Sequence, residues 1–239
     1  MPDDARVDAE EFERARRETV RYHEELYASV SLGDQGTWLA NPQPLFADAM
    51  ALLPTDRSLV AYDLGAGVGR HTIPLLQELP SGSDVYATDL LSSALEALED
   101  AVPPGIHSRL HLREGDLEGF EFEARADLVF AFSVVEHLPS PEAIRRLFAR
   151  THDALAPGGV LAVGIIADRT EITDDGTRRP GRVESGITAL QAADLLADSF
   201  GDHDLSLARL EPSRVRETRG DESYTLDSTL VTWLSTSPR

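Results

Sequence analysis

The 239-residue chain is predicted to fold as a doubly wound α/β protein with a mostly parallel sheet and helices on both faces. Two observations predict this class. Between residues 58 and 166, apolar strand-like runs alternate with segments of helical spacing, which is typical of βαβ units. Over residues 204–236, two further runs alternate apolar and polar residues more strictly, which indicates an antiparallel hairpin at one edge of the sheet.

The N-terminal part of the chain predicts a helical cover rather than strands of the sheet. Residues 8–32 carry apolar side chains near helical spacing, and residues 45–53 predict a second helix that ends at Pro54. A segment rich in glycine, asparagine and proline separates the two. We therefore expect an N-terminal helical extension, or lid, over residues 1–54 and a main domain over residues 55–239.

The main domain predicts strands and helices in alternating order. The expected strands cover residues 58–64, 84–90, 109–116, 126–133 and 158–166. The expected helices cover residues 70–79, 92–102 and 140–155, the last with Ser140 as N-cap and Pro141 at the first helical position. A helix over 188–200 and strands over 204–212 and 224–236, connected by residues 214–223, complete the pattern.

Residues 167–187 differ from the rest of the main domain because they are polar and show no periodicity. A long loop inside a compact domain usually serves function. We therefore expect this segment to be a loop that helps to form the pocket for a second ligand.

Charge and composition narrow the classes of partner. The formal net charge is −20 and every one of the 22 basic residues is arginine, so nucleic acids and anionic lipids are not expected to bind. No apolar run approaches the roughly 18 residues of a membrane span and the N-terminus is polar, so we expect cytoplasmic residence. The absence of cysteine excludes thiolate chemistry, and no metal site is predicted. The acidic, lysine-free composition is typical of salt adaptation or a GC-rich genome.

The stretch VAYDLGAGVGRH carries the clearest chemistry. Gly65, Gly67 and Gly69 follow a predicted strand with the spacing G-x-G-x-G. Arg70 stands where the dinucleotide fingerprint G-x-G-x-x-G has its third glycine. A carboxylate at Asp63 would repel a diphosphate at short range, so the turn favours a cationic ligand. S-adenosylmethionine (SAM), with its sulfonium and ammonium groups, is such a ligand.

Two further acids follow at the ends of the next two strands. Asp89 lies at roughly the 20-residue offset from the first glycine at which an acid binds ribose hydroxyls. Asp116 can accept a hydrogen bond from an adenine amino group. Open α/β sheets bind ligands at the carboxyl ends of their strands, so the three acids predict one nucleoside site.

These motifs, in this order, resemble those of class I SAM-dependent methyltransferases. VAYDLGAGVGR, VYATDL, LREGDL, ADLVFAFSVVEHL and ALAPGGVLAV resemble five successive family motifs over about residues 58–166. The resemblance implies a seven-stranded sheet with an antiparallel last strand, and SAM as the cofactor. It implies that Asp63, Gly65, Ala66, Gly67 and Gly69 line its methionine end, Asp89 and Leu90 its ribose and adenine, Asp116 and Leu117 its adenine edge, and Phe132 and Ser133 its other side. Ala66 stands where many members have cysteine.

The acceptor side of the cleft offers fewer candidates. His137 in SVVEHL is the candidate general base, with a structural histidine as the alternative. Its neighbour Glu136 can instead bond backbone groups, and His71 can simply face solvent. Trp38 is a candidate lid or cofactor-pocket residue, with core packing as the alternative.

Two groups of side chains are secondary candidates for the acceptor pocket. Tyr22, His23 and Tyr27 on the first helix can reach the cleft or only pack against it. Arg178, Arg179 and Arg182 can bind a carboxylate or phosphate of a small acceptor, or remain solvated.

The sequence therefore predicts an enzyme that transfers a methyl group from SAM to a small-molecule acceptor by in-line displacement. A SAM-binding protein without catalysis and, less well supported, a dinucleotide-dependent oxidoreductase are the alternatives.

Overall fold

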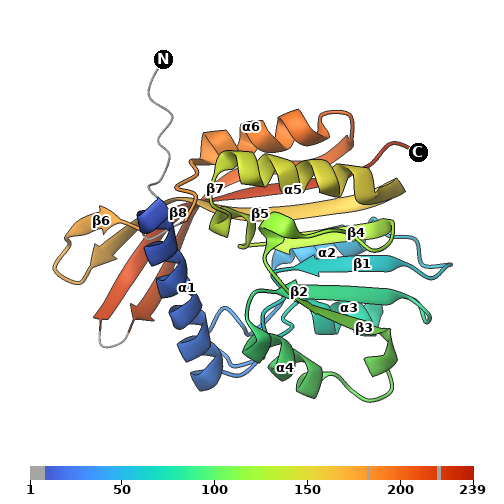
Figure 1. Cartoon of the computed structure of the whole chain (residues 1–239), viewed down its shortest axis with the longest axis horizontal. Coiled ribbons are helices and arrows are strands. Elements are labelled where there is room, and N and C mark those ends of the chain that lie inside the picture. Colours follow the sequence, from blue (N-terminus) through green and yellow to red (C-terminus); the bar gives the residue numbers. More distant parts are fainter. Residues whose placement is uncertain (1–8, 182–183, 220–221) are drawn as a thin grey trace.

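One mixed sheet forms the centre of the fold in the computed structural model, which describes residues 9–181, 184–219 and 222–239 (Figure 1). Its strands run in the spatial order β3-β2-β1-β4-β5-β8-β7, and β6 pairs with β5. The bounds are β1 Val60–Leu64, β2 Asp84–Asp89, β3 Leu110–Glu114, β4 Ala126–Phe132, β5 Leu155–Thr173, β6 Arg178–Pro180, β7 Asp204–Arg219 and β8 Glu222–Thr236.

The strand directions confirm the predicted α/β class. Strands β1 to β5 pair in parallel, whereas β8 is antiparallel to both β5 and β7. The main path of seven strands with an antiparallel last strand is the expected sheet. The short β6, antiparallel to β5, is an addition that the sequence did not predict.

Helices cover both faces of the sheet. They are α1 Ala9–Ser29, α2 Pro44–Met50, α3 Thr72–Glu78, α4 Ser92–Ala101, α5 Pro141–Ala154 and α6 Ala189–Phe200, with short 3₁₀ turns η1 His107–Arg109, η2 Leu117–Gly119 and η3 Val135–His137. Figure 1 shows α5 and α6 on one side of the sheet and α3 and α4 on the other. Successive residues of a strand point to opposite faces of the sheet. Ala61 therefore packs in the core under α2, α3 and α4, and Tyr62 packs in the core under α5 and α6.

Local sequence explains where helices α5 and α6 begin. Ser140 accepts a hydrogen bond from the backbone N–H of Ala143, and Pro141 occupies the first turn, as predicted. Thr188 and Gln191 form a reciprocal capping box at the start of α6. These caps satisfy backbone donors that would otherwise lack partners.

The remaining predicted helices are present with shifted ends. The first helix spans Ala9–Ser29 instead of 8–32, residue 8 lying outside the described residues. The helix predicted over 45–53 spans Pro44–Met50, and the one predicted over 70–79 spans Thr72–Glu78. Helices α2 and α3 begin without a side-chain cap, so no local signal marks their first residue, and apolar periodicity alone does not fix a helix end to one residue.

The prediction of a loop over residues 167–187 is wrong for its first half. Strand β5 continues to Thr173 past an irregularity between Ala167 and Thr170, and then pairs with β6. Polar cross-strand pairs hold this hairpin, with Arg179 ion-paired to Glu171 at 2.7 Å. Such pairs stabilise strands without an apolar alternation, so the sequence pattern is missing.

The predicted connection over residues 214–223 is also wrong, because it is mostly strand. Strand β7 runs to Arg219 and β8 begins at Glu222, with Arg214 ion-paired across the ladder to Asp227 at 2.8 Å. Strands β5, β7 and β8 therefore extend well beyond the others and project past the edge of the sheet towards α1 (Figure 1). Among the described residues, no helix is long and apolar enough to cross a membrane.

Candidate active site

Two adjoining cavities lie at the carboxyl ends of β1, β2 and β4, beneath α1. The larger has a volume of about 260 Å³ and the smaller about 120 Å³. His23, Gly65 and His137 line both. The position is the one at which open α/β sheets bind ligands.

The smaller cavity brings together the residues predicted to hold ribose and adenine. Asp89, Leu90, Asp116 and Leu117 all line it, together with Gly65. Asp89 is held in place by backbone donors, since its carboxylate accepts from Gly67 N at 2.7 Å and from Leu91 N at 3.0 Å. Burial raises the pKa of Asp89, and these hydrogen bonds oppose that rise.

The glycine turn leaves room above the strand end. Gly65 has φ +74°, and a Cβ there would lie 2.5 Å from Val134. Gly67 has φ +52°, and a Cβ would lie 2.6 Å from the hydroxyl of Tyr27. Gly65, Ala66 and Gly67 line the cavities, whereas Gly69 packs against Leu98 of α4. The first two glycines therefore shape the ligand space and the third permits close helix packing.

Asp63 does not line either cavity. Its side chain is 1% exposed and accepts a hydrogen bond from Thr72 Oγ1 at 2.6 Å. Burial, and to a smaller extent the charge of Asp89, raises the pKa of Asp63 to about 7. The sequence placed this carboxylate against a cationic ligand, but the structure buries it under the glycine turn, where it anchors the start of α3. Its contact with the cofactor therefore stays a prediction.

Phe132, Ser133 and Trp38, which the sequence predicted near the cofactor, line the larger cavity, and Ser133 also lines the smaller one. Ser133 has φ +52°, and its hydroxyl donates to Glu136 Oε1 at 2.9 Å. Glu136 is fully buried and also accepts from the backbone N–H of Ile166. Its role is therefore to fix the turn after β4 against β5, in agreement with the structural alternative.

His71 does not face solvent, contrary to the alternative drawn from its sequence position. It is 7% exposed, and its Nε2 accepts a hydrogen bond from the backbone N–H of Gln43 at 3.2 Å. Burial lowers the pKa of His71 to about 3, so the ring is neutral. The imidazole packs 4.6 Å from the ring of Phe130, and one edge lines the larger cavity.

His137 is paired with a residue that the sequence did not single out. Its Nδ1 lies 2.8 Å from Oε2 of Glu184, whose side chain is 1% exposed. Burial alone would lower the pKa of His137, but the charge and hydrogen bond of Glu184 outweigh it and raise the pKa. Burial likewise opposes ionisation of Glu184, yet the pair lowers its pKa. Glu184 is thus ionised and accepts a hydrogen bond from Nδ1–H of His137.

Helix α1 crosses the cleft. Tyr22, His23 and Tyr27 line the larger cavity, so all three reach the cleft. The Nδ1 of His23 lies 2.9 Å from the carbonyl oxygen of Thr19, and burial and nearby His137 lower its pKa to about 4. Near the other end of α1, Arg16 is ion-paired with Asp116 in the smaller cavity.

Two of the predicted acceptor arginines, Arg178 and Arg179, line neither of the two cavities. Arg178 is paired with Asp227 at 3.1 Å, and Arg179 is paired with Glu171 and Glu222. Arg182 lies outside the described residues. Among the described residues, Arg70 and Arg169 reach the larger cavity, and the buried Nε of Arg169 has no hydrogen-bond partner. The polar segment after residue 166 was the available signal for both Arg169 and Glu184.

The far wall of the larger cavity is formed by the extended hairpin. Alternate residues of β7 face it, namely Ser213, Val215 and Glu217, and so do alternate residues of β8, namely Tyr224, Leu226, Ser228 and Leu230. Tyr224 donates its hydroxyl proton to Glu217 at 2.7 Å. The wall thus combines an apolar surface with a few polar groups, as small-molecule sites do.

Comparison with known proteins agrees with this geometry. Residues 62–161 match the family model of a methyltransferase domain. Over 121 residues the chain is 31% identical to a trans-aconitate 2-methyltransferase of Azoarcus sp., covering 48% of this chain and 42% of that protein. It is 35% identical over 116 residues to the protein of the same name from Rhizobium meliloti. That match covers 48% of this chain and 42% of that protein. The chain spans less than half the length of these curated relatives.

Solved structures share the fold. A SAM-dependent methyltransferase of Methanosarcina mazei superposes with a TM-score of 0.60 at 14% identity, covering 83% of this chain and 99% of that one. The N-methyltransferase NodS of Bradyrhizobium japonicum, in complex with S-adenosylhomocysteine (SAH), superposes with a TM-score of 0.53 at 14% identity. That match covers 96% of this chain and 99% of that one. The strand order and the solved structures agree with the matched domain, so residues 62–161 form a methyltransferase domain of the class I, SAM-dependent kind, with SAM as its cofactor.

Proposed function

We propose that this chain transfers the methyl group of SAM to a small-molecule acceptor bound in the larger cavity. The observation that carries the proposal is the position of His137, which lines both cavities and is backed by the buried carboxylate of Glu184. SAM would place its nucleoside in the smaller cavity and its methionine end over Gly65, which lines both cavities, towards Gly67 in the larger one. The methyl group would then face the larger cavity beside His137.

The residues of this chain supply alignment, exclusion of water and a proton acceptor. Methyl transfer from a sulfonium has a good leaving group, so positioning the acceptor accounts for most of the rate. Because Glu184 only accepts hydrogen bonds, Nδ1 of His137 carries a proton and Nε2 has the free lone pair. That nitrogen is available to take a proton from a hydroxyl or amine acceptor as the new bond forms.

His23 has a complementary role in this proposal. Its Nδ1 faces a backbone carbonyl, which only accepts, so Nε2 again holds the lone pair. With a pKa of about 4, His23 is neutral at physiological pH and adds no charge beside a sulfonium. It would orient the acceptor by accepting a hydrogen bond, while His137 takes the proton.

The acceptor chemistry is supported by the cavity and by the relatives. Arg169 offers an unpaired guanidinium nitrogen, which suits an acceptor with a carboxylate. The relatives are named for trans-aconitate, a small carboxylic acid. We therefore favour a small acceptor that bears a carboxylate and an apolar part that packs on the β7–β8 wall.

We further propose that the N-terminal extension acts as a lid. The smaller cavity, at about 120 Å³, falls below the roughly 300 Å³ of ordinary ligand pockets. Arg16 is ion-paired with Asp116, the residue that is proposed to bind the adenine edge. Release of this ion pair and a shift of α1 would admit the nucleoside, and return of α1 would exclude water.

The proposal is tested by incubating the tag-free protein with SAM and a panel of small carboxylates and by measuring SAH formation. Val215→Trp should fill the acceptor side and raise the acceptor KM at least about tenfold, with SAM affinity unchanged. Leu210→Trp is the matched control, because Leu210 is 47% exposed on the opposite face of β7. SAM binding without SAH formation on any acceptor would instead indicate a SAM-binding protein.

A further inference from the structure

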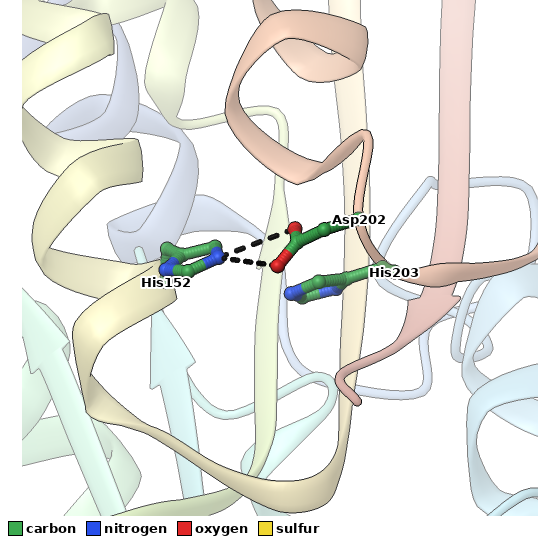
Figure 2. A group of neighbouring side chains, drawn as sticks. All are labelled: His152, Asp202 and His203. Atoms are coloured by element: carbon green, nitrogen blue, oxygen red, sulfur yellow. Dashed lines mark hydrogen bonds and ion pairs between the residues drawn. The ribbon is translucent and has the colours of Figure 1, made fainter. Parts of the chain in front are cut away.

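A second cluster of chemically reactive side chains lies at the other edge of the sheet. His152 is in the last turn of α5, and Asp202 and His203 lie in the turn between α6 and β7 (Figure 2). The cofactor cleft is at the carboxyl ends of the parallel strands, whereas this cluster is where β7 begins. None of the three residues lines either cavity of the candidate active site.

The three side chains converge on one point. Nε2 of His152 lies 3.2 Å from each carboxylate oxygen of Asp202, and the two imidazole rings stack with centroids 5.4 Å apart. One ligand atom from each residue lies within 4.8 Å of the others. Among the described residues, this is the one group of three potential metal ligands with such spacing.

His203 provides an independent sign of a missing ligand. It is 8% exposed, and its buried Nε2 has no hydrogen-bond partner. Its Nδ1 lies 3.1 Å from Ser235 Oγ, which also accepts a hydrogen bond from the indole of Trp233. A buried polar atom without a partner is unfavourable. A ligand that accepts the lone pair of Nε2 would remove this cost.

The electrostatics of the cluster suit a cation. The buried Nε2 of His203 has no hydrogen-bond partner, so its lone pair is free for a metal ion. Asp202 contributes a carboxylate whose two oxygens each lie 3.2 Å from Nε2 of His152. The hydrogen bond from Nδ1 to Ser235 would fix the tautomer and the direction of the ring, as outer contacts of metal-bound histidines do.

We propose that His152, Asp202 and His203 bind a divalent transition metal, with Zn²⁺ the best-suited ion. Two imidazoles and one carboxylate favour Zn²⁺ over Mg²⁺ or Ca²⁺, which prefer oxygen ligands. His203 is fixed in the core, whereas His152 and Asp202 are exposed enough to move to the roughly 2.0–2.2 Å that zinc requires. The ion would join the end of α5 to the start of β7. A water molecule would complete the tetrahedron.

The sequence predicted no metal site because the ligands are distant along the chain. His152 and Asp202 are 50 residues apart, and no short spacing of histidines marks the pair. The fold brings them together by packing α5 against α6. The ion would serve stability and not methyl transfer, since it would lie away from the cofactor cleft.

The experiment titrates Zn²⁺ into tag-free, EDTA-dialysed protein by calorimetry. One site per chain is expected, with a thermal midpoint that rises on Zn²⁺ addition and does not rise with Mg²⁺. His152→Ala and His203→Gln should each weaken Zn²⁺ binding at least about tenfold and remove the thermal shift. Co²⁺ should give the visible absorption of a tetrahedral site in the wild type only.

The matched control is His111→Ala. His111 also lies beside a carboxylate, 2.7 Å from Asp84, but the described residues offer it no second histidine ligand. This variant should bind Zn²⁺ like the wild type. Equal affinity in the wild type and His152→Ala, or no binding at all, would overturn the proposal. If His203→Gln fails to fold, the half-exposed His152→Ala decides the question alone.

Discussion

Nδ1 of His137 lies 2.8 Å from Oε2 of Glu184, although 47 residues separate them along the chain. The pair joins the turn after β4 to the segment that follows β6, at the boundary of the two cavities. A buried carboxylate behind a histidine fixes the tautomer and supports a positive charge on the ring. This arrangement is the basis of the proposed proton transfer.

His137→Ala should lower turnover by about 10²- to 10⁴-fold on an acceptor that loses a proton, because a positioned base contributes about this much. SAM affinity should change little, since Asp89 and the glycine turn would still hold the nucleoside. Steady-state kinetics and SAH calorimetry measure the two quantities separately. Exposed His107→Ala serves as the control. Undiminished turnover in His137→Ala on the true acceptor would reject the base.

Glu184→Gln should shift the acidic limb of the pH–rate profile to lower pH. Turnover requires neutral His137, so it falls as the pH drops through the raised pKa of this histidine, above 6.5. Without the carboxylate, burial dominates and the pKa of His137 falls. Profiles of kcat/KM for both proteins check the shift. An acidic limb that stays in place or moves upward would show that Glu184 does not control this proton.

Asp89→Asn should weaken SAM and SAH binding by about ten- to hundredfold, because the carboxylate proposed to accept hydrogen bonds from the ribose hydroxyls would be replaced by a neutral amide. Calorimetry with SAH gives the affinity. Asp84→Asn, the same change at the other end of β2, is the control and should leave binding intact. Equal affinities for all three proteins would remove Asp89 from the nucleoside site.

The free energy of unfolding of Asp63→Asn, compared with that of the wild type at the same pH, should increase as the pH rises from about 4 to 7. The folded pKa of Asp63, about 7, is above the unfolded value of 3.8. Its contribution to stability is therefore complete below the unfolded pKa and is lost as the pH rises through the folded one. Asn keeps an acceptor for Thr72 and does not ionise. Urea unfolding at pH 4 and pH 8 compares the two, and a difference independent of pH would contradict the burial of an ionisable group.

Local sequence was enough for the fold and for half of the site. Asp89 ends a strand that is visible in the sequence, and Asp116 and Ser133 follow two others, so their position at the carboxyl ends of the strands could be predicted. The cap at Ser140 was equally local. Their predictions depended on neighbours in the chain alone.

The rest depended on contacts between distant residues. Glu184 could not be assigned because its partner His137 is far away in sequence and its own segment has no period. The burial of Asp63 could not be predicted, because a sequence shows a carboxylate near the end of a buried strand but not that Thr72 donates a hydrogen bond to it. The extensions of β5 and β7 could not be predicted, because cross-strand ion pairs stabilise them and their sequence lacks the alternation of apolar and polar residues.

The most direct test of the central claim is thermal unfolding of the tag-free protein with SAM, SAH and NAD in turn. A ligand that binds only the folded protein raises its midpoint, by an amount that grows with concentration over Kd. The proposed site predicts stabilisation by SAM and SAH, its loss in Asp89→Asn, and none by NAD. Stabilisation by NAD alone would contradict the methyltransferase site.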